Sequence, residues 1–201
     1  VVCMNLSIRQ AAAADMASAV PLLLDSGEQL LIDIFGDGER DSAYQYLCYA
    51  WSNGYGQYGF NNHWVACTDE DVVGLITCWH DKLPADFDRD TLSSITEHFG
   101  LDQSIDVVMR SQRFSAALHP PLATELGVGH LSVAAGARRQ GVGRPLMRVA
   151  EEKAREHKKF AMVLDVEVSN ETARRFYQAL GFGEHQHAAP FIQMIKAVPP
   201  L

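Results

Sequence analysis

Residues 138–144 combine two glycines with three arginines in the order Arg-Arg-Gln-Gly-Val-Gly-Arg. Glycine has no Cβ, so a phosphate oxygen can approach its backbone, while arginine supplies positive charge and hydrogen-bond donors. An amphipathic helical pattern begins near Val142, and the first turn of a helix leaves about four N–H groups without intrahelical partners. These groups and the helix dipole favour an anion. The segment is therefore predicted to bind a phosphate or pyrophosphate group.

Two well-known phosphate-binding loops fit this segment less well. A dinucleotide-binding loop requires GxGxxG, and Leu146 stands where the third glycine would be. A Walker loop ends in Gly-Lys-Ser/Thr, which is absent here. A plain structural turn needs only one glycine and no arginines.

The surrounding residues resemble the signature of the GNAT acetyltransferases. The resemblance covers residues 128–183 and rests on Leu131, Val133, Arg138, Gly141, Gly143, Leu164, Val166, Asn170, Ala173, Phe176, Tyr177, Gly181 and Phe182. It implies that the cofactor is acetyl-CoA, held by Leu131, Ser132, Val133, Arg138, Arg139, Gln140, Gly141, Val142, Gly143, Arg144, Asn170 and Tyr177. By the same resemblance, backbone N–H groups of residues 139–144 bind the pyrophosphate, and Val133 hydrogen-bonds the acetyl carbonyl and the pantetheine arm.

Acetyl transfer to an amine also needs an acid for the leaving thiolate and a base for the amine. The resemblance implies that Tyr177 is the acid, and a reference pKa of about 10 keeps a tyrosine protonated at neutral pH. The base stays open, because Gly127 or Gly129 stands at the strand position where many relatives carry a glutamate or histidine. Glu125 and His130 are the nearest substitutes. Alternatively, no dedicated base exists and the amine loses its proton to solvent.

The elements that must position these residues follow an α/β pattern. The sequence predicts a first strand over residues 6–10, a helix that Asp15 caps, helical segments over 27–35 and 41–51, and a β-hairpin over 63–80 with an acidic tip at 69–71. A strand over 127–134, a helix over 142–157, a strand over 160–168, a helix over 171–180 and a strand over 191–198 follow. Gly127 and Gly129 are predicted to allow a bulge in their strand. We expect a mixed, mostly antiparallel central sheet flanked by helices, as in the GNAT fold.

Residues 81–122 are predicted to be an inserted helical arm, placed before the cofactor-binding strand. Pro84, Pro120 and Pro121 punctuate it, and two helical patterns lie within it, over residues 91–99 and 104–114. The GNAT resemblance does not account for this segment. It is expected to form either a lid over the active site or a homodimer contact.

The composition bounds the class of protein. With 201 residues, of which 47% are hydrophobic, the chain is expected to form a single acyl-CoA N-acyltransferase domain over residues 1–201. The net charge of −8 argues against nucleic-acid binding. No apolar run is long enough to span a membrane and no signal segment is evident, so a cytoplasmic location is expected. The four cysteines lack CxxC spacing, and His185 and His187 lack a third ligand, so no metal is expected.

The charge is divided unevenly along the chain. Residues 1–80 carry two basic and ten acidic residues, whereas residues 138–159 carry eight basic and three acidic residues. We therefore expect a basic seat for the cofactor and an acidic approach for a cationic acceptor, unless both are only solvated helix faces. In the GNAT family the acceptor usually lies near the first helices, here residues 35–44, which carry Asp37, Glu39 and Asp41.

These features predict an acetyl-CoA-dependent N-acetyltransferase. It would transfer the acetyl group directly to a small-molecule or peptide amine within a ternary complex, without metal. The alternative is a non-catalytic acyl-CoA-binding module, either a sensor or a protein-interaction module. Retention of Tyr177 favours the enzyme, and the missing strand base favours the module.

Overall fold

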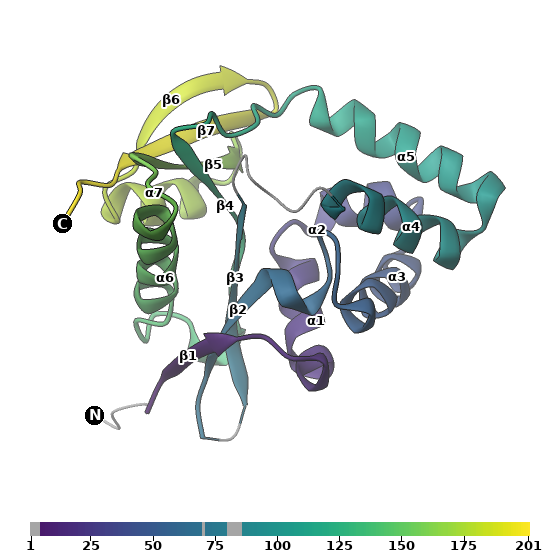
Figure 1. Ribbon diagram of the computed structural model, residues 1–201, viewed down its shortest axis with the longest axis horizontal. Coiled ribbons are helices and arrows are strands. Elements are labelled where there is room, and N and C mark those ends of the chain that lie inside the picture. The colour runs from purple at the N-terminus through teal and green to yellow at the C-terminus, as the bar shows by residue number, and fades with distance from the viewer. Residues whose placement is uncertain (1–4, 70, 80–85) are drawn as a thin grey trace. The chain divides into compact units, whose positions relative to one another are not determined.

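The computed structural model of the chain describes residues 5–69, 71–79 and 86–201. Its strands are β1 (Ser7–Gln10), β2 (His63–Cys67), β3 (Val72–Trp79), β4 (Glu125–Val133), β5 (Ala161–Glu167), β6 (Gly183–Ala188) and β7 (Phe191–Ala197) (Figure 1). Its α-helices are α1 (Met16–Asp25), α2 (Glu28–Leu31), α3 (Arg40–Asn53), α4 (Phe87–Phe99), α5 (Leu101–Ser115), α6 (Gly143–Glu156) and α7 (Glu171–Ala179). Short 3-10 or π-helical turns occupy Ala13–Asp15, Ile32–Gly36, Phe60–Asn62 and Ala135–Ala137.

The seven strands form one sheet in the order β1-β2-β3-β4-β5-β7-β6. The pairs β1–β2, β2–β3, β5–β7 and β6–β7 are antiparallel, and β4–β5 is parallel. The predicted fold class is therefore confirmed: the protein is a mixed α/β protein with a mostly antiparallel sheet and flanking helices.

The chain is divided between two compact units. The first contains residues 1–77, 84–112 and 130–146, and the second contains residues 78–83, 113–129 and 147–201. Strand β4 and helix α6 each begin in one unit and end in the other. A single acyltransferase domain over residues 1–201 stays a prediction.

The core of the first unit is built from helices α1 to α4 and strands β2 and β3. Leu23, Leu24, Tyr46 and Trp51 are fully buried. The Tyr46 hydroxyl lies 2.9 Å from Ser94 Oγ, which joins α3 to α4. The described part of the predicted arm is thus helical, and α4 packs against α3.

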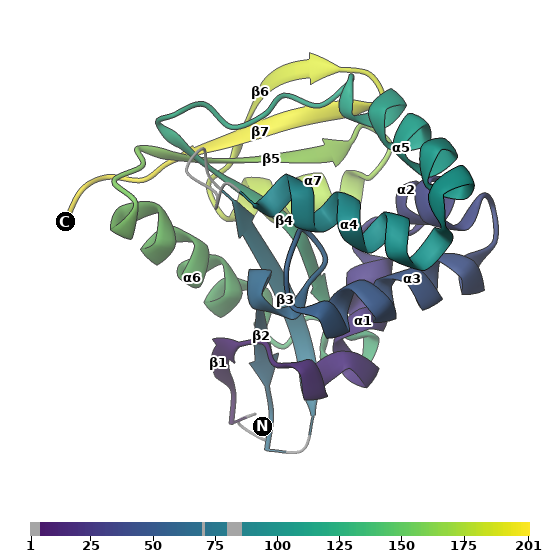
Figure 2. The ribbon, with the colours of Figure 1, turned by 45° about the vertical axis from the view of Figure 1, so that its right-hand side comes forward.

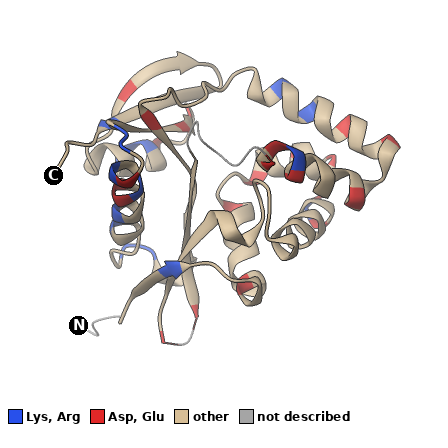
Figure 3. Ribbon diagram, in the orientation of Figure 1, with Lys and Arg blue, Asp and Glu red and all other residues tan. Residues whose placement is uncertain are grey.

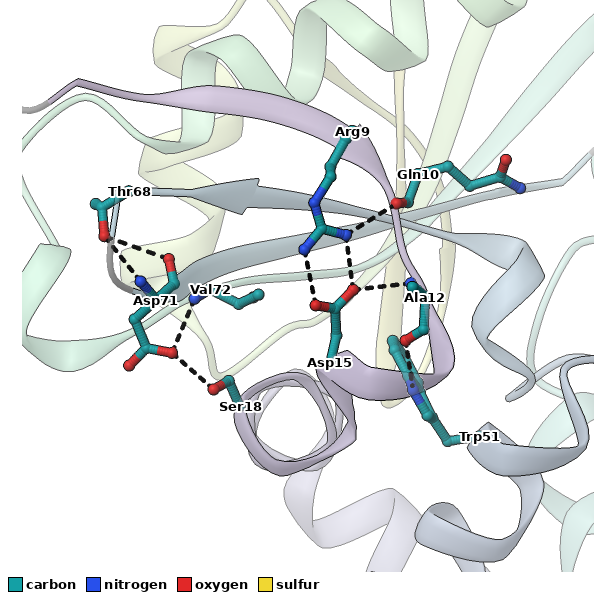
Figure 4. Close-up of polar contacts among 9 residues, drawn as sticks. All are labelled: Arg9, Gln10, Ala12, Asp15, Ser18, Trp51, Thr68, Asp71 and Val72. Atoms are coloured by element: carbon teal, nitrogen blue, oxygen red, sulfur yellow. Dashed lines mark hydrogen bonds and ion pairs between the residues drawn. The ribbon is translucent and has the colours of Figure 1, made fainter.

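The start of α1 differs from the prediction, because Asp15 does not cap this helix. Both of its carboxylate oxygens accept hydrogen bonds from the Arg9 guanidinium at 2.8 Å, and Oδ2 also accepts the Ala12 N–H at 2.8 Å (Figure 4). A bidentate guanidinium competes well for a carboxylate, because it supplies two parallel charge-assisted bonds. Asp15 therefore ties strand β1 to the turn that precedes α1.

In the second unit, alternating residues of β5 and β7 point to opposite faces of the sheet. Met162 and Leu164 lie on the same face as Ile192 and Met194, and all four are buried. The Lys196 ammonium, on that face, pairs with Glu151 of α6 at 2.5 Å. Helix α6 thus covers this face (Figure 2). Asp165 and Gln193 lie on the other face.

The predicted elements are present, with shifted boundaries and one omission. Helix α4 begins at Phe87 instead of residue 91, α5 at Leu101 instead of 104, and β4 at Glu125 instead of 127. The edge strand β6 was not predicted, because its sequence GEHQHA is polar and almost entirely exposed. The tip residue Glu70, His80 and residues 81–85 of the predicted arm lie outside the described residues.

Candidate active site

The predicted phosphate-binding segment is a loop between β4 and α6. It begins with the 3-10 turn Ala135–Ala137, and its backbone then adopts positive φ at Arg139 (61°) and Gly141 (80°) before α6 begins at Gly143. Arg138 Nε donates to the Val133 carbonyl at 3.1 Å, and Gln140 Nε2 donates to the Gly136 carbonyl at 2.9 Å. These bonds fold the loop back on itself at the start of α6.

Buried apolar side chains anchor this loop against strand β3. Val142 and Leu146 are 2% and 0% exposed. A Cβ added to Gly74 of β3 would lie 2.9 Å from the side chains of both. Gly74 is therefore small so that the start of α6 can pack closely on β3. Pro145, in the first turn, lacks an N–H that would have no helical partner there.

The anchored loop presents charge to solvent. Its exposed residues include Arg138, Arg139, Gln140, Gly141 and Arg144. Figure 3 shows basic residues on this loop and along α6. The loop thus brings together exposed arginines, a glycine backbone and a helix N-terminus, three features that favour an anion.

Strand β4 leads into this loop and pairs with β5 over only part of its length. Its pairing with β5 ends at Gly127 and Val163, although β4 continues to Val133. The backbone turns at His130, where φ is 49°, which a histidine rarely adopts within a strand. Leu131, Ser132 and Val133 follow this turn. The irregularity that the sequence predicted is therefore present, but it lies at His130 and not at a glycine.

The two glycines of β4 have a different role from the predicted one. A Cβ on Gly127 would lie 2.2 Å from Trp79 Nε1, and one on Gly129 would lie 2.3 Å from the far edge of the same indole. Trp79 thus occupies the space that side chains at positions 127 and 129 would need. A side chain at either position would therefore collide with the indole.

His130 is held in one tautomer by its hydrogen bonds. Ser26 Oγ lies 2.6 Å from the Leu23 carbonyl and 2.9 Å from His130 Nδ1. The single hydroxyl proton of Ser26 goes to the carbonyl, so His130 Nδ1 must donate to Ser26 Oγ. Its Nε2 therefore carries a lone pair. Burial lowers the pKa of His130 to about 4, so the imidazole is neutral at pH 7.

Glu125, the other predicted base, lies at the start of β4. It is 5% exposed, and its Oε1 accepts the Leu122 N–H at 2.8 Å. Seven residues of the strand separate it from Val133. These observations favour a structural role for Glu125, in closing the turn before β4.

Asn170 and Tyr177 lie at the start and near the end of α7. Asn170 Oδ1 accepts the Ala173 N–H at 3.1 Å, so Asn170 is the N-cap of α7. Tyr177 lies between Phe176 and Phe182, with ring centroids 5.4 and 5.9 Å away. Burial raises the pKa of Tyr177 to about 12. Within the described residues its hydroxyl makes no hydrogen bond, so it is available as a donor.

The acidic loop near residues 35–44 is partly neutralised. Asp37 is held in a left-handed conformation, with φ of 49°, and its Oδ1 lies 3.8 Å from Arg110 Nη1 of α5. Arg110 Nε also donates to the Ile34 carbonyl at 2.9 Å. Glu39 and Asp41 are exposed. The inserted arm therefore contacts the predicted acceptor loop through Arg110.

The described residues contain no group of three or more His, Cys, Asp or Glu side chains placed to hold a metal ion. His187 is instead 3.5 Å from Glu184 on β6. None of the described helices combines the length and apolar character that crossing a membrane requires.

Comparison with protein families identifies the family of this chain. The model of the acetyltransferase (GNAT) family matches residues 24–182. The chain belongs to the GNAT acetyltransferase family. None of the curated proteins compared with this acetyltransferase matches it significantly.

Solved structures of acetyltransferases share the fold of this GNAT protein at low sequence identity. An N-acetyltransferase from Staphylococcus aureus Mu50 is 14% identical, with a TM-score of 0.69 over 94% of this chain and 100% of that one. The PaiA N-acetyltransferase from Thermoplasma acidophilum, in complex with coenzyme A, is 13% identical, with a TM-score of 0.55 over 96% and 99%. The ribosomal-protein-S18-alanine N-acetyltransferase from Escherichia coli is 12% identical, with a TM-score of 0.53 over 98% and 96%.

The residues predicted to form the site of this GNAT acetyltransferase occur in both units. His130, Val133 and the loop 138–144 belong to the first, and Glu125, Asn170 and Tyr177 belong to the second. Sequence reasoning missed Ser26, which orients His130, and Trp79, which covers the β4 glycines. The Gly-x-Gly of β4 was a usable signal, because a strand often carries glycine where a ring packs on its backbone.

Proposed function

We propose that this GNAT acetyltransferase transfers the acetyl group of acetyl-CoA directly to an amine within a ternary complex. The observation that carries the proposal is the loop 138–144, which follows β4 and the short turn Ala135–Ala137. Its exposed arginines and its glycine backbone lie at the start of α6. We also propose that residues 1–201 act as one catalytic domain.

In this proposal the cofactor is held by backbone and by charge. The N–H groups of residues 139–144 and the guanidinium groups of Arg138, Arg139 and Arg144 bind the pyrophosphate. Leu131 and Ser132 line the path of the pantetheine arm, and Asn170 contacts the cofactor. The Val133 N–H donates to the thioester carbonyl, where negative charge grows as the amine attacks. Gln140, Gly141, Val142 and Gly143 shape the loop.

The proton transfers are assigned to two partly buried side chains. His130 Nε2, which carries a lone pair, accepts a proton as the amine nitrogen bonds to the acetyl carbon. The carbon–sulfur bond then breaks, and Tyr177 donates a hydrogen bond to the departing thiolate. A phenol with a pKa of about 12 is a weaker acid than a thiol, whose pKa is about 8.5. Tyr177 therefore acts mainly as a hydrogen-bond donor to the thiolate and keeps its own proton. The thiolate takes its proton from solvent.

The acceptor is proposed to be a cationic primary amine, either a small molecule or a peptide. Asp37, Glu39 and Asp41 attract it to the first unit. Reversing the charge of Glu39 and Asp41 should raise the Michaelis constant for such an amine. Asp37 contributes less, because Arg110 lies beside it.

Release of free thiol from acetyl-CoA across a panel of amines tests the proposal. We expect amine-dependent release, and His130→Gln should lower kcat/KM by about 100-fold, the usual size of a general-base contribution. His185→Gln, on the exposed strand β6, is the matched control and should change nothing. If the chain binds coenzyme A but no amine promotes release, the non-catalytic acyl-CoA-binding module is the correct interpretation.

A further inference from the structure

Helix α5 exposes its most apolar stripe. Leu101, Ile105 and Met109 recur every four residues, so they share one face of the helix, and they are 71%, 55% and 50% exposed. The residues that α5 buries are Ser104 and Val107. A surface helix normally packs its apolar stripe on the core and leaves polar residues to solvent. In α5 this order is reversed, and a continuous apolar row of this kind marks an interaction surface.

The opposite face of α5 is already held within the first unit. Val107 is fully buried, and Arg110 Nε donates to the Ile34 carbonyl at 2.9 Å. With about 3.6 residues per turn, Val107 lies about 160° around the helix axis from Ile105. The apolar stripe therefore cannot turn toward these contacts without breaking them, and its cover has to come from outside the first unit.

The charged residues of α5 follow an order along the helix. Asp102 and Asp106 lie in its first half, and Arg110 and Arg113 lie in its second half (Figure 3). Asp102 and Arg113 are both exposed. At about 100° per residue they are only about 20° apart around the axis. One edge of the apolar stripe thus has an acidic end and a basic end.

Two copies of such a helix complement each other when they run antiparallel. A two-fold axis brings the same edge of both helices together, with the start of one beside the end of the other. Asp102 of each copy then faces Arg113 of the other, so the ion pair is formed twice. The same alignment sets Ile105 beside Met109 of the second copy, because both pairs are centred near residue 107.

We propose that α5 is the contact surface of an antiparallel, two-fold symmetric homodimer. A uniformly basic partner would be repelled at Arg113 and a uniformly acidic one at Asp102, whereas a second copy meets opposite charge at both ends. A contact made by one pair of helices is small for a specific interface, so the dimer is expected to dissociate at micromolar concentrations. This role of the inserted arm does not depend on the proposed acetyltransferase function.

Sedimentation velocity of the full chain at increasing micromolar concentrations tests the proposal by a charge swap. The wild-type protein should shift from a monomer of 22.2 kDa to a dimer. Asp102→Arg and Arg113→Asp each set like charges opposite one another, and each should raise the dissociation constant by about 10-fold. The double variant restores opposite charges and should recover the wild-type value. The two positions are about 16 Å apart along one helix, so this rescue cannot arise within one copy.

Two further variants complete the test. Ile105→Lys removes an apolar contact from an exposed position, so the chain should keep its circular dichroism spectrum and become monomeric. Gln103→Arg is the matched control, because it adds charge to an exposed position about 160° from Ile105 and should leave the dimer intact.

Every result either supports or overturns the proposal. A wild-type chain that stays monomeric at all concentrations overturns it, and so does a dimer that survives Ile105→Lys. A double variant that stays as weak as the single variants overturns the antiparallel arrangement. If the chain is monomeric and Ile105→Lys instead changes kcat/KM, the arm is a lid and not a dimer contact. A dimer with the expected charge rescue supports the proposal whether or not the chain turns over amines.

Discussion

The pKa values of His130 and Tyr177 are shifted in opposite directions by the same physical cause. Burial penalises the charged form, so it lowers the pKa of the imidazole to about 4 and raises that of the phenol to about 12. Each group is therefore neutral at pH 7. In the proposed mechanism the neutral imidazole accepts a proton and the neutral phenol donates a hydrogen bond.

The Tyr177 hydroxyl is the group whose removal tests this assignment most directly. Tyr177→Phe keeps the ring between Phe176 and Phe182, so the fold and the affinity for coenzyme A should be preserved. The turnover number should fall by about 100-fold, because the departing thiolate loses its donor. Steady-state kinetics and calorimetry with coenzyme A measure the two quantities. Unchanged turnover would sink the assignment.

At the scale of elements, close packing against strand β3 fixes the cofactor loop. Gly74 of β3 admits Val142 and Leu146, so the start of α6 sits close to the sheet. The arginines in front of these anchors are exposed and make few contacts that could hold the loop in place. The loop geometry thus depends on a strand that carries none of the predicted binding residues.

Gly74→Val should therefore weaken the binding of coenzyme A, although residue 74 is not among the residues predicted to contact the cofactor. The added side chain would displace Val142 and Leu146 and move the N-terminal N–H groups of α6. Overpacking of this kind costs about 1–3 kcal/mol, and we expect the dissociation constant to rise by about 10-fold. Calorimetry with coenzyme A measures the change. Gly136→Ala is the control, since no atom lies within 4 Å of an added Cβ there.

The Arg9–Asp15 pair joins β1 to the turn before α1 and gives the fold an acid-sensitive contact. The Arg9 hydrogen bonds lower the pKa of Asp15, so its contribution is present above the unfolded pKa of about 3.9 and is lost as the pH falls through the folded pKa. Asp15→Asn should destabilise the protein by about 2 kcal/mol at pH 7. Denaturant titrations should show the difference shrinking below about pH 4; a constant difference would contradict this role.

Sequence patterns predicted the elements better than they predicted the contacts between them. The regular periodicity of α6, β5 and β7 was enough to place these elements, because it reflects one buried face. The polar strand β6 gave no such signal, since its stability comes from pairing with β7. Asp15 was predicted to cap α1, but its carboxylate accepts hydrogen bonds from Arg9, six residues earlier. The cofactor loop was predictable because its chemistry is local, whereas the environments of His130 and Asp165 depend on residues distant in sequence.

At the scale of the whole molecule, Asp165 should make stability depend on pH in the opposite sense to Asp15. Burial raises its folded pKa to about 6, above the unfolded value of about 3.9, so unfolding releases a proton in this window and stability falls as the pH rises from about 4 to 6. Asp165→Asn should remove this loss and raise the stability at pH 7 by about 1 kcal/mol, allowing for the partial exposure of the carboxylate. Thermal unfolding at pH 4.5 and 7 measures it, and a destabilised variant at pH 7 would refute the assignment.

The alternation of the chain between two units limits how the protein can be divided or rebuilt. The first unit draws on residues as late as 146, and the second on residues as early as 78. No single cut therefore separates the two units, because the stretch 1–146 that holds the whole first unit also carries residues 78–83 and 113–129 of the second. A cut within residues 78–146 divides each unit between the two fragments. Such a pair of fragments could serve as a split-protein reporter, because neither unit is complete until the fragments associate.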